Sequence, residues 1–148
     1  MKLIETDIGI AASPERVWSI LTDLEKYAEW NPFIKNAKGK VQVGEKLEVL
    51  ISPPKGKTMV FKPIVKSVIE NSEFIWLGRF LFPGIFDGEH IFNIHHDDSG
   101  SLLVQKEKFG GILVPMMWSS LDTNTRAGFE LMNQALKERA ESKNISRA

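Results

Sequence analysis

Apolar and polar residues alternate from residue 3 to residue 11, and this two-residue period is typical of a half-buried strand. A helix start follows, because Ser13 precedes Pro14 as an N-cap residue precedes a proline at the first helical position. Apolar residues then recur at helical spacing as far as Thr22. The chain is therefore predicted to open with a strand and one short helix.

A second short helix is predicted after Asp23, which can cap it. This helix must end at Asn31, because a residue that precedes proline is pushed out of the helical region. Tyr27, Trp30 and Phe33 gather three aromatic rings in the stretch YAEWNPFI. We interpret this stretch mainly as corner packing, with a role facing or covering a ligand as the alternative for Trp30 or Phe33.

Strand patterns separated by turn residues fill residues 33–110. Met59 and Val65 share one apolar face, and Pro63 between them indicates an edge strand or a bulge, because proline cannot donate a ladder hydrogen bond. Three further alternating runs lie within residues 74–109. The segment predicts an antiparallel meander that brings the sheet to six or seven strands.

After Pro115, apolar residues recur at steps of three and four, which is the period of an amphipathic helix. From Met116 to about Glu141 this helix would measure roughly 39 Å at about 1.5 Å per residue. A compact domain of this size has a radius of gyration of only about 15 Å. The helix must therefore lie across the whole domain, and residues 142–148, which lose the pattern, are expected to form a frayed tail.

This order of elements predicts an α+β fold in which one curved antiparallel sheet faces one long C-terminal helix. The 148 residues fit one domain, which we place at residues 1–141. Periodicity leaves open whether side chains fill the space between sheet and helix or whether a ligand occupies it.

Composition and charge exclude several partners and chemistries. Nineteen basic residues balance nineteen acidic ones, so no general positive field favours nucleic acid. There is no cysteine, and no apolar run approaches the roughly 20 residues of a membrane span. Glu5 and Asp7 interrupt any signal-peptide pattern, which indicates a soluble, cytoplasmic protein.

A phosphate-binding glycine loop and a serine with a recognisable base are also missing, so we expect neither hydrolase nor kinase chemistry and no cofactor.

The pair His95 and His96, followed by Asp97 and Asp98, is the most obvious candidate for a metal site. Adjacent strand residues point to opposite faces, so the two imidazoles cannot converge on one ion without a bulge. Asp98 more simply begins a turn at Ser99-Gly100. We therefore expect no metal site.

Several short segments follow one another in a recognisable order. They are ASPERVW at 12–18, LTD at 21–23 with YAEWNP at 27–32, GEH at 88–90, Glu107-x-Phe109-x-Gly111, and GFELMNQALK at 128–137. In this order they resemble the SRPBCC superfamily, the START-like and polyketide cyclase-like proteins with the helix-grip fold. The resemblance extends over nearly the whole chain, from about Ile4 to Ala140.

The resemblance implies a curved antiparallel sheet wrapped around the C-terminal helix, with a deep apolar cavity between them. Across the superfamily, such cavities hold lipids, sterols, polyketides or other hydrophobic molecules. No single reaction is implied, because members include carriers, cyclases, and stress-response and chaperone-linked proteins.

His90 and Glu107 are the main candidates for chemistry. A hairpin at residues 97–100 would place their strands side by side, and each residue shares its face with apolar neighbours, so both are expected to point into the cavity. Burying a lone carboxylate costs several kcal/mol, so Glu107 should be paired, protonated or hydrated. The pair could anchor a ligand's hydroxyl, carbonyl or carboxyl group, act as general acid and base, or form only a structural hydrogen bond.

Other candidates for ligand contact face the same space, although they could equally fill the core. They are Trp76, Phe80, Phe92, Gln105, Phe109, Met117, Leu121, Phe129 and Met132. Two apolar loops are candidates for the cavity mouth, with Phe82, Pro83 and Ile85 in one and Leu113 and Pro115 in the other, and the resemblance implies that residues 52–57 lie beside them. Loops this apolar are expected to be shielded from solvent. A gated mouth, a dimer interface and mutual packing of the loops are the three alternatives.

Three hypotheses follow from these observations. The first is a binding or carrier protein, without catalysis, for a small hydrophobic ligand such as a lipid, a polyketide or an aromatic molecule. The second is an enzyme of the polyketide cyclase or dehydratase type that uses His90 and Glu107. The third is an interaction module, or a homodimer, that associates through the apolar loops.

Overall fold

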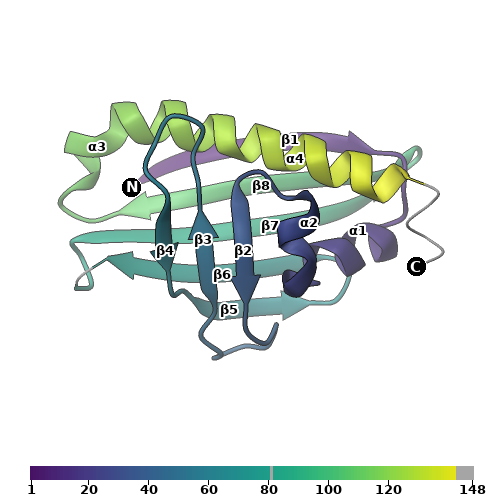
Figure 1. Cartoon of the computed structure of the whole chain (residues 1–148), viewed down its shortest axis with the longest axis horizontal. Coiled ribbons are helices and arrows are strands. Elements are labelled where there is room, and N and C mark those ends of the chain that lie inside the picture. The colour runs from purple at the N-terminus through teal and green to yellow at the C-terminus, as the bar shows by residue number, and fades with distance from the viewer. Residues whose placement is uncertain (81, 143–148) are drawn as a thin grey trace.

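The computed structural model describes residues 1–80 and 82–142 (Figure 1). In chain order its elements are β1 (Lys2–Ile10), α1 (Pro14–Leu21), the 3-10 turn η1 (Leu24–Lys26), α2 (Tyr27–Trp30), β2 (Ile34–Lys38), β3 (Glu48–Ile51), β4 (Met59–Phe61), β5 (Ile64–Ile69), β6 (Glu73–Phe80), β7 (Phe86–Asp97), β8 (Gly100–Gly110), α3 (Val114–Ser120), the π-helical turn η2 (Leu121–Thr125) and α4 (Arg126–Glu141). The predicted α+β fold with a long C-terminal helix is confirmed.

The strands form two antiparallel sheets rather than one. A large sheet has the order β1-β8-β7-β6-β5, and a small sheet has the order β2-β3-β4. In Figure 1 the small sheet crosses the strands of the large one, and the long helix runs along the top of both. The residues that the structure describes thus contain eight strands, where the sequence predicted six or seven in a single sheet.

Pro63 marks the place where the two sheets separate. The sequence pattern placed Met59 and Val65 on one face of one strand, but Met59 lies in β4 of the small sheet and Val65 in β5 of the large one. The proline carbonyl accepts a hydrogen bond from the backbone N–H of Leu47 (2.8 Å), outside the regular ladder. The break follows from the missing N–H of proline, which ends the ladder at this point.

The start of α1 agrees with the sequence prediction, whereas the start of the second helix differs from it. The Ser13 hydroxyl accepts a hydrogen bond from the backbone N–H of Arg16 (3.2 Å), and Pro14 occupies the first turn. Asp23 makes no such capping bond, because residues 24–26 form a separate 3-10 turn before α2 begins. The predicted end at Asn31 is observed, and its extended backbone (ψ 114°) leads to Pro32.

The aromatic corner is packed as predicted for Tyr27. This residue is fully buried, its hydroxyl donates to the carbonyl of Leu21, and its ring meets Trp30 edge-on with centroids 5.2 Å apart. Burial, reinforced by the charge of Asp23, raises the pKa of Tyr27 above its usual range. Phe33 differs from Tyr27, because its ring lines a cavity between the sheets and the helix.

The C-terminal helix runs from Val114 to Glu141, starting two residues before the predicted Met116. The π-helical turn η2 separates α3 from α4, and none of its five residues is buried. Beyond it, α4 lies against the large sheet and buries Phe129, Met132 and Leu136. The second half of the helix therefore contains most of its buried residues, whereas α3 contributes Val114.

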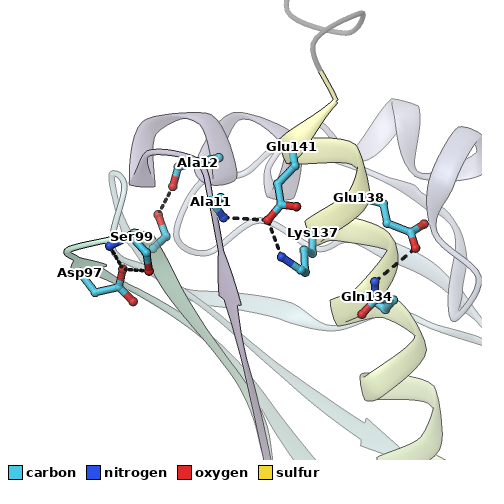
Figure 2. A network of polar contacts seen from close by, with 9 residues as sticks. Ala11, Ala12, Asp97, Ser99, Gln134, Lys137, Glu138 and Glu141 are labelled. Atoms are coloured by element: carbon cyan, nitrogen blue, oxygen red, sulfur yellow. Dashed lines mark hydrogen bonds and ion pairs between the residues drawn. The ribbon is translucent and has the colours of Figure 1, made fainter.

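The end of α4 is held against the connection between β1 and α1 (Figure 2). A carboxylate oxygen of Glu141 binds the Lys137 ammonium and also accepts the backbone N–H of Ala11 at 2.8 Å. These two bonds lower the pKa of Glu141. Of the tail predicted at residues 142–148, only Ser142 belongs to the described residues, and its backbone has already left the helix.

Candidate ligand-binding cavity

A cavity of about 500 Å³ lies between the two sheets and the long helix. Its walls come from three directions and are mostly apolar. The small sheet and its flanking segments contribute Phe33, Val49, Ile51, Pro53, Met59, Phe61 and Pro63; the large sheet contributes Trp76, Phe86 and Phe109; the helix side contributes Leu113, Met117 and Leu121.

Two glycines hollow out the large sheet beneath this cavity. Gly78 of β6 and Gly88 of β7 are direct partners in the ladder, and both line the cavity. A Cβ on Gly78 would lie 3.9 Å from the Gly88 carbonyl oxygen and from Cβ of Pro63, which is ordinary van der Waals contact, so it would fit without overlap. A Cβ on Gly88 would overlap Oε2 of Glu107. The glutamate carboxyl thus occupies the space that a side chain at residue 88 would fill.

The predicted ligand-contact residues fall into two groups. The cavity is lined by Trp76, His90, Glu107, Phe109, Met117 and Leu121. The core, where α4 lies on the sheet, contains the fully buried Phe92, Gln105, Phe129 and Met132. Phe80 belongs to β6 and pairs with Phe86, while its side chain lies outside the described part of the structure.

The two loops predicted to form the mouth lie side by side. The backbone N–H of Ile112 donates to the carbonyl of Gly84 (3.0 Å), and that of Leu113 donates to the carbonyl of Ile85 (3.1 Å). Leu113 lines the cavity, and the lining does not include Phe82, Pro83, Ile85 or Pro115. Phe82 is 70% exposed, so the described residues do not cover it.

The wall formed by the small sheet was missed in the sequence. Val49 and Ile51 alternate on β3, and Met59 and Phe61 alternate on β4, so each pair presents one face. This signal was available, but the pattern does not reveal that the hairpin forms a second sheet opposite the first. Polar lining residues were missed as well, namely Arg79, Ser120, Asn124 and Thr125, whereas Lys57 belongs to the segment 52–57 that was expected near the mouth.

A chain of buried hydrogen bonds determines which nitrogen of His90 carries the proton. The Thr6 hydroxyl donates to the carbonyl of Gln105 (2.9 Å), so its oxygen accepts from Nδ2 of Asn133 (2.9 Å). Oδ1 of Asn133 then accepts from Nε2 of Gln105 (2.7 Å). The remaining amide oxygen, Oε1 of Gln105, lies 2.9 Å from Nε2 of His90 and must accept its hydrogen. Neutral His90 therefore has a lone pair at Nδ1.

That lone pair faces Glu107, the ladder partner of His90. Nδ1 lies 3.5 Å from Oε1 of the carboxyl, and the two side chains are 2% and 17% exposed. Burial lowers the pKa of His90 to about 4, although the hydrogen bond to Gln105 raises it. Burial also raises the pKa of Glu107 to about 8. At neutral pH the imidazole is uncharged and the carboxyl keeps its proton.

This arrangement places a neutral carboxyl group beside a neutral imidazole at the wall of an apolar space. Because Nδ1 of His90 faces Glu107, the carboxyl is the group through which the pair meets the contents of the cavity. A carboxylic acid with its pKa near neutrality is suited either to hydrogen bonding or to general acid catalysis. The geometry is compatible with both roles.

The adjacent histidines His95 and His96, at which we expected no metal site, are separate from the cavity. His95 and His96 are exposed, and the turn is begun by Asp97 rather than Asp98, since Asp97 accepts the backbone N–H of Ser99 (3.0 Å). Within residues 1–80 and 82–142, no three His, Asp or Glu side chains are grouped to hold a metal ion. Over the same ranges, no helix has both the length and the apolar character needed to cross a membrane.

Antiparallel strands, here in a five-stranded and a three-stranded sheet, that enclose an apolar cavity with a long C-terminal helix are the arrangement of the helix-grip class. Within that class, the family described as "Polyketide cyclase / dehydrase and lipid transport" matches residues 1–141. The chain belongs to this family. No curated protein matches its sequence.

Solved structures show the same fold at low sequence identity. A START superfamily protein from Mycobacterium smegmatis is 23% identical with a TM-score of 0.72, covering 94% of this chain and 97% of that one. Protein MLL2253 from Mesorhizobium loti is 19% identical with a TM-score of 0.71, covering 95% and 100%. The di-domain ARO/CYC StfQ from the steffimycin biosynthetic pathway is 12% identical with a TM-score of 0.68, covering 95% of this chain and 52% of that one. These similarities concern the fold alone.

Proposed function

We propose that the protein binds and carries a small hydrophobic molecule in the cavity between its two sheets and its long helix. The observation that carries this proposal is the cavity itself, whose volume of about 500 Å³ lies in the range of about 300–1,000 Å³ that is usual for ligand pockets. The family description, which includes lipid transport, supports it.

The walls favour a flat or flexible apolar ligand, such as an aromatic molecule, a polyketide or a lipid. Phe33, Trp76 and Phe109 present rings to the cavity, and rings pack well against flat molecules. Met59 and Met117 line it as well, and methionine adapts its shape to what it contacts.

Two measurements test the proposal. Titration with the neutral fluorescent probe N-phenyl-1-naphthylamine should give saturable binding of one probe per chain. Native mass spectrometry after incubation with a lipid extract should show a retained molecule. A protein that neither enhances the fluorescence nor retains any molecule would not be a carrier of this kind.

A second candidate function is catalysis of the cyclase or dehydratase type. The observation that favours it is the carboxyl of Glu107, which keeps a proton near neutral pH beside the neutral imidazole of His90. Turnover of a panel of polyketide and polyphenolic substrates should then fall in both His90→Ala and Glu107→Gln. Equal rates in the wild type and both variants would remove the catalytic role and leave the carrier role intact.

Association of two copies through the apolar loops stays a prediction. Its support is the exposure of Phe82, Ile112 and Met116, at 70%, 73% and 77%. Sedimentation over a range of concentrations measures it directly. A wild type that remains monomeric at high concentration would contradict the prediction.

A further inference from the structure

The two oxygens of Glu107 have different surroundings. Oε1 faces Nδ1 of His90 at 3.5 Å. Oε2 lies above Gly88 on the cavity floor, where the missing side chain leaves room for it. Within residues 1–80 and 82–142, no donor is hydrogen-bonded to Oε2. Oε1 thus faces a side chain of the protein, and Oε2 is available to a ligand in the cavity.

The tautomer of His90 decides what Oε2 can do. Nε2 of His90 donates to Gln105, so Nδ1 presents a lone pair toward Oε1. An ionised Glu107 would place two acceptors face to face with no hydrogen between them. A protonated Glu107 removes this conflict when its proton lies on Oε1, the oxygen that faces Nδ1 at 3.5 Å, and Oε2 is then a carbonyl-type oxygen that accepts hydrogen bonds. The raised pKa of Glu107 agrees with this assignment.

We propose that the cavity selects hydrophobic ligands that carry a neutral hydroxyl group, which donates a hydrogen bond to Oε2 of Glu107, over the same skeletons carrying a carboxylate. This inference rests on the proposed function, because it requires a ligand in the cavity. It names the chemistry at one end of that ligand, an alcohol or a phenol.

A carboxylate placed against Oε2 of Glu107 would meet an acceptor rather than a donor. It would also lose its hydration in an apolar space, and an unpaired buried charge costs several kcal/mol. Two basic residues among the lining, Lys57 and Arg79, are the groups that could hold a carboxylate elsewhere in the cavity. Arg79 already has a partner in Asp87, with Nε to Oδ1 at 3.6 Å. Lys57 is therefore the residue to replace in a control variant when binding is measured.

Three naphthalenes with a shared skeleton test the proposal. They carry, at position 2, a hydroxymethyl group, a methyl group or a carboxylate, and each competes against N-phenyl-1-naphthylamine at pH 7. The wild type should bind the alcohol about tenfold more tightly than the carboxylate. The methyl-to-alcohol ratio of Kd values should fall by about threefold to tenfold in Glu107→Met, because the variant lacks the acceptor.

The matched variant is Glu107→Gln. Its amide can donate to Nδ1 of His90 and present its carbonyl oxygen at the place of Oε2, so it reproduces the protonated carboxyl. This variant should keep the wild-type ratio within about twofold, well inside the effect expected for a lost hydrogen bond. Lys57→Gln should also keep the preference for the alcohol, because that preference originates at the cavity floor.

The outcomes separate this inference from the proposed function. If Glu107→Met leaves the methyl-to-alcohol ratio unchanged, or if the carboxylate binds the wild type as tightly as the alcohol, the hydroxyl preference is wrong and the cavity still binds apolar molecules. If neither the probe nor any naphthalene binds, the carrier function itself fails. If Glu107→Met does not fold, the wild-type comparison of alcohol and carboxylate decides the inference.

Discussion

His90 and Glu107 are directly opposed on β7 and β8, with Nδ1 of the imidazole 3.5 Å from Oε1 of the carboxyl. Burial makes both charged forms unfavourable, lowering the pKa of His90 to about 4 and raising that of Glu107 to about 8. Between those values the folded pair holds one titratable proton, on the carboxyl. The change of stability with pH therefore depends on how many protons the same two groups hold in the unfolded chain.

We expect the free energy of unfolding to fall as the pH rises from 6.5 to about 8. Between pH 4.5 and 6.5, the ordinary values of the two groups, the unfolded pair also holds one proton, on the histidine, so the pair contributes no slope. Above pH 6.5 the unfolded pair has lost its proton while the folded pair keeps it. Folding then binds a proton, and stability decreases by about 2 kcal/mol in total.

Urea unfolding at pH 6.5 and pH 8.5 measures this difference, with Glu107→Gln as the control. The variant has no carboxyl proton to lose, so the additional fall seen in the wild type should disappear. A fall of the same size in both proteins would show that other groups cause it.

Gly78→Val should block ligand binding without disturbing the sheet. A Cβ at residue 78 has no neighbour closer than 3.9 Å, and the valine methyl groups would enter the cavity above the sheet. We expect the affinity for N-phenyl-1-naphthylamine to fall about tenfold or more, since even one methylene in a pocket is worth roughly that much. Gly9→Val is the matched control, because Gly9 is an exposed strand glycine outside the cavity lining. Equal affinity in the two variants would place the probe elsewhere.

Gln105→Met should destabilise the protein by about 3 kcal/mol. The substitution leaves Nε2 of His90 and Oδ1 of Asn133 buried without their shared partner, and each such loss costs about 1–3 kcal/mol. Gln134→Met is the control, since Gln134 is exposed on α4, next to Asn133 in the chain, and its side chain bonds to Glu138 (3.2 Å). That change should remain within about 0.5 kcal/mol. Similar urea midpoints for the two variants would contradict the network.

The sequence allowed the opposition of His90 and Glu107 to be predicted, because a hairpin turn with a period of two determines which residues meet. The ladder continues without a shift from Asp97↔Gly100 to His90↔Glu107. Whether a side chain faces a cavity or the core was not predictable in this way. Gln105 and Glu107 share one face of β8, yet α4 covers the first and the cavity lies over the second.

The small sheet shows a second limit of periodicity. Alternation is enough to place Val49 and Ile51 on one face of β3, but it contains no information about which other sheet that face meets. That arrangement depends on Pro63, which separates β4 from β5, and on contacts between segments distant in the chain. The part of the cavity wall that the small sheet forms could therefore not be predicted from the pattern of single strands.

Replacing Gly128 of α4 with alanine would have two opposing effects on the stability of the protein, and these effects differ in size. Alanine is about 1 kcal/mol more favourable than glycine inside a helix, so Gly128→Ala would ordinarily stabilise the protein. Here a Cβ would overlap the ring of Phe33, which is only 2% exposed and packs edge-on against Phe129 with centroids 5.7 Å apart. A ring so enclosed cannot move aside freely, and overpacking costs about 1–3 kcal/mol.

We therefore expect Gly128→Ala to destabilise the wild type and to stabilise a Phe33→Val variant. Valine removes the ring atoms that the new Cβ would overlap, which leaves the gain in helix propensity unopposed. A double-mutant cycle by urea unfolding measures the change of sign as a coupling energy of about 1–3 kcal/mol. If Gly128→Ala has the same effect in both backgrounds, the ring and the helix are not in contact, and Phe33 does not form the wall between α4 and the cavity.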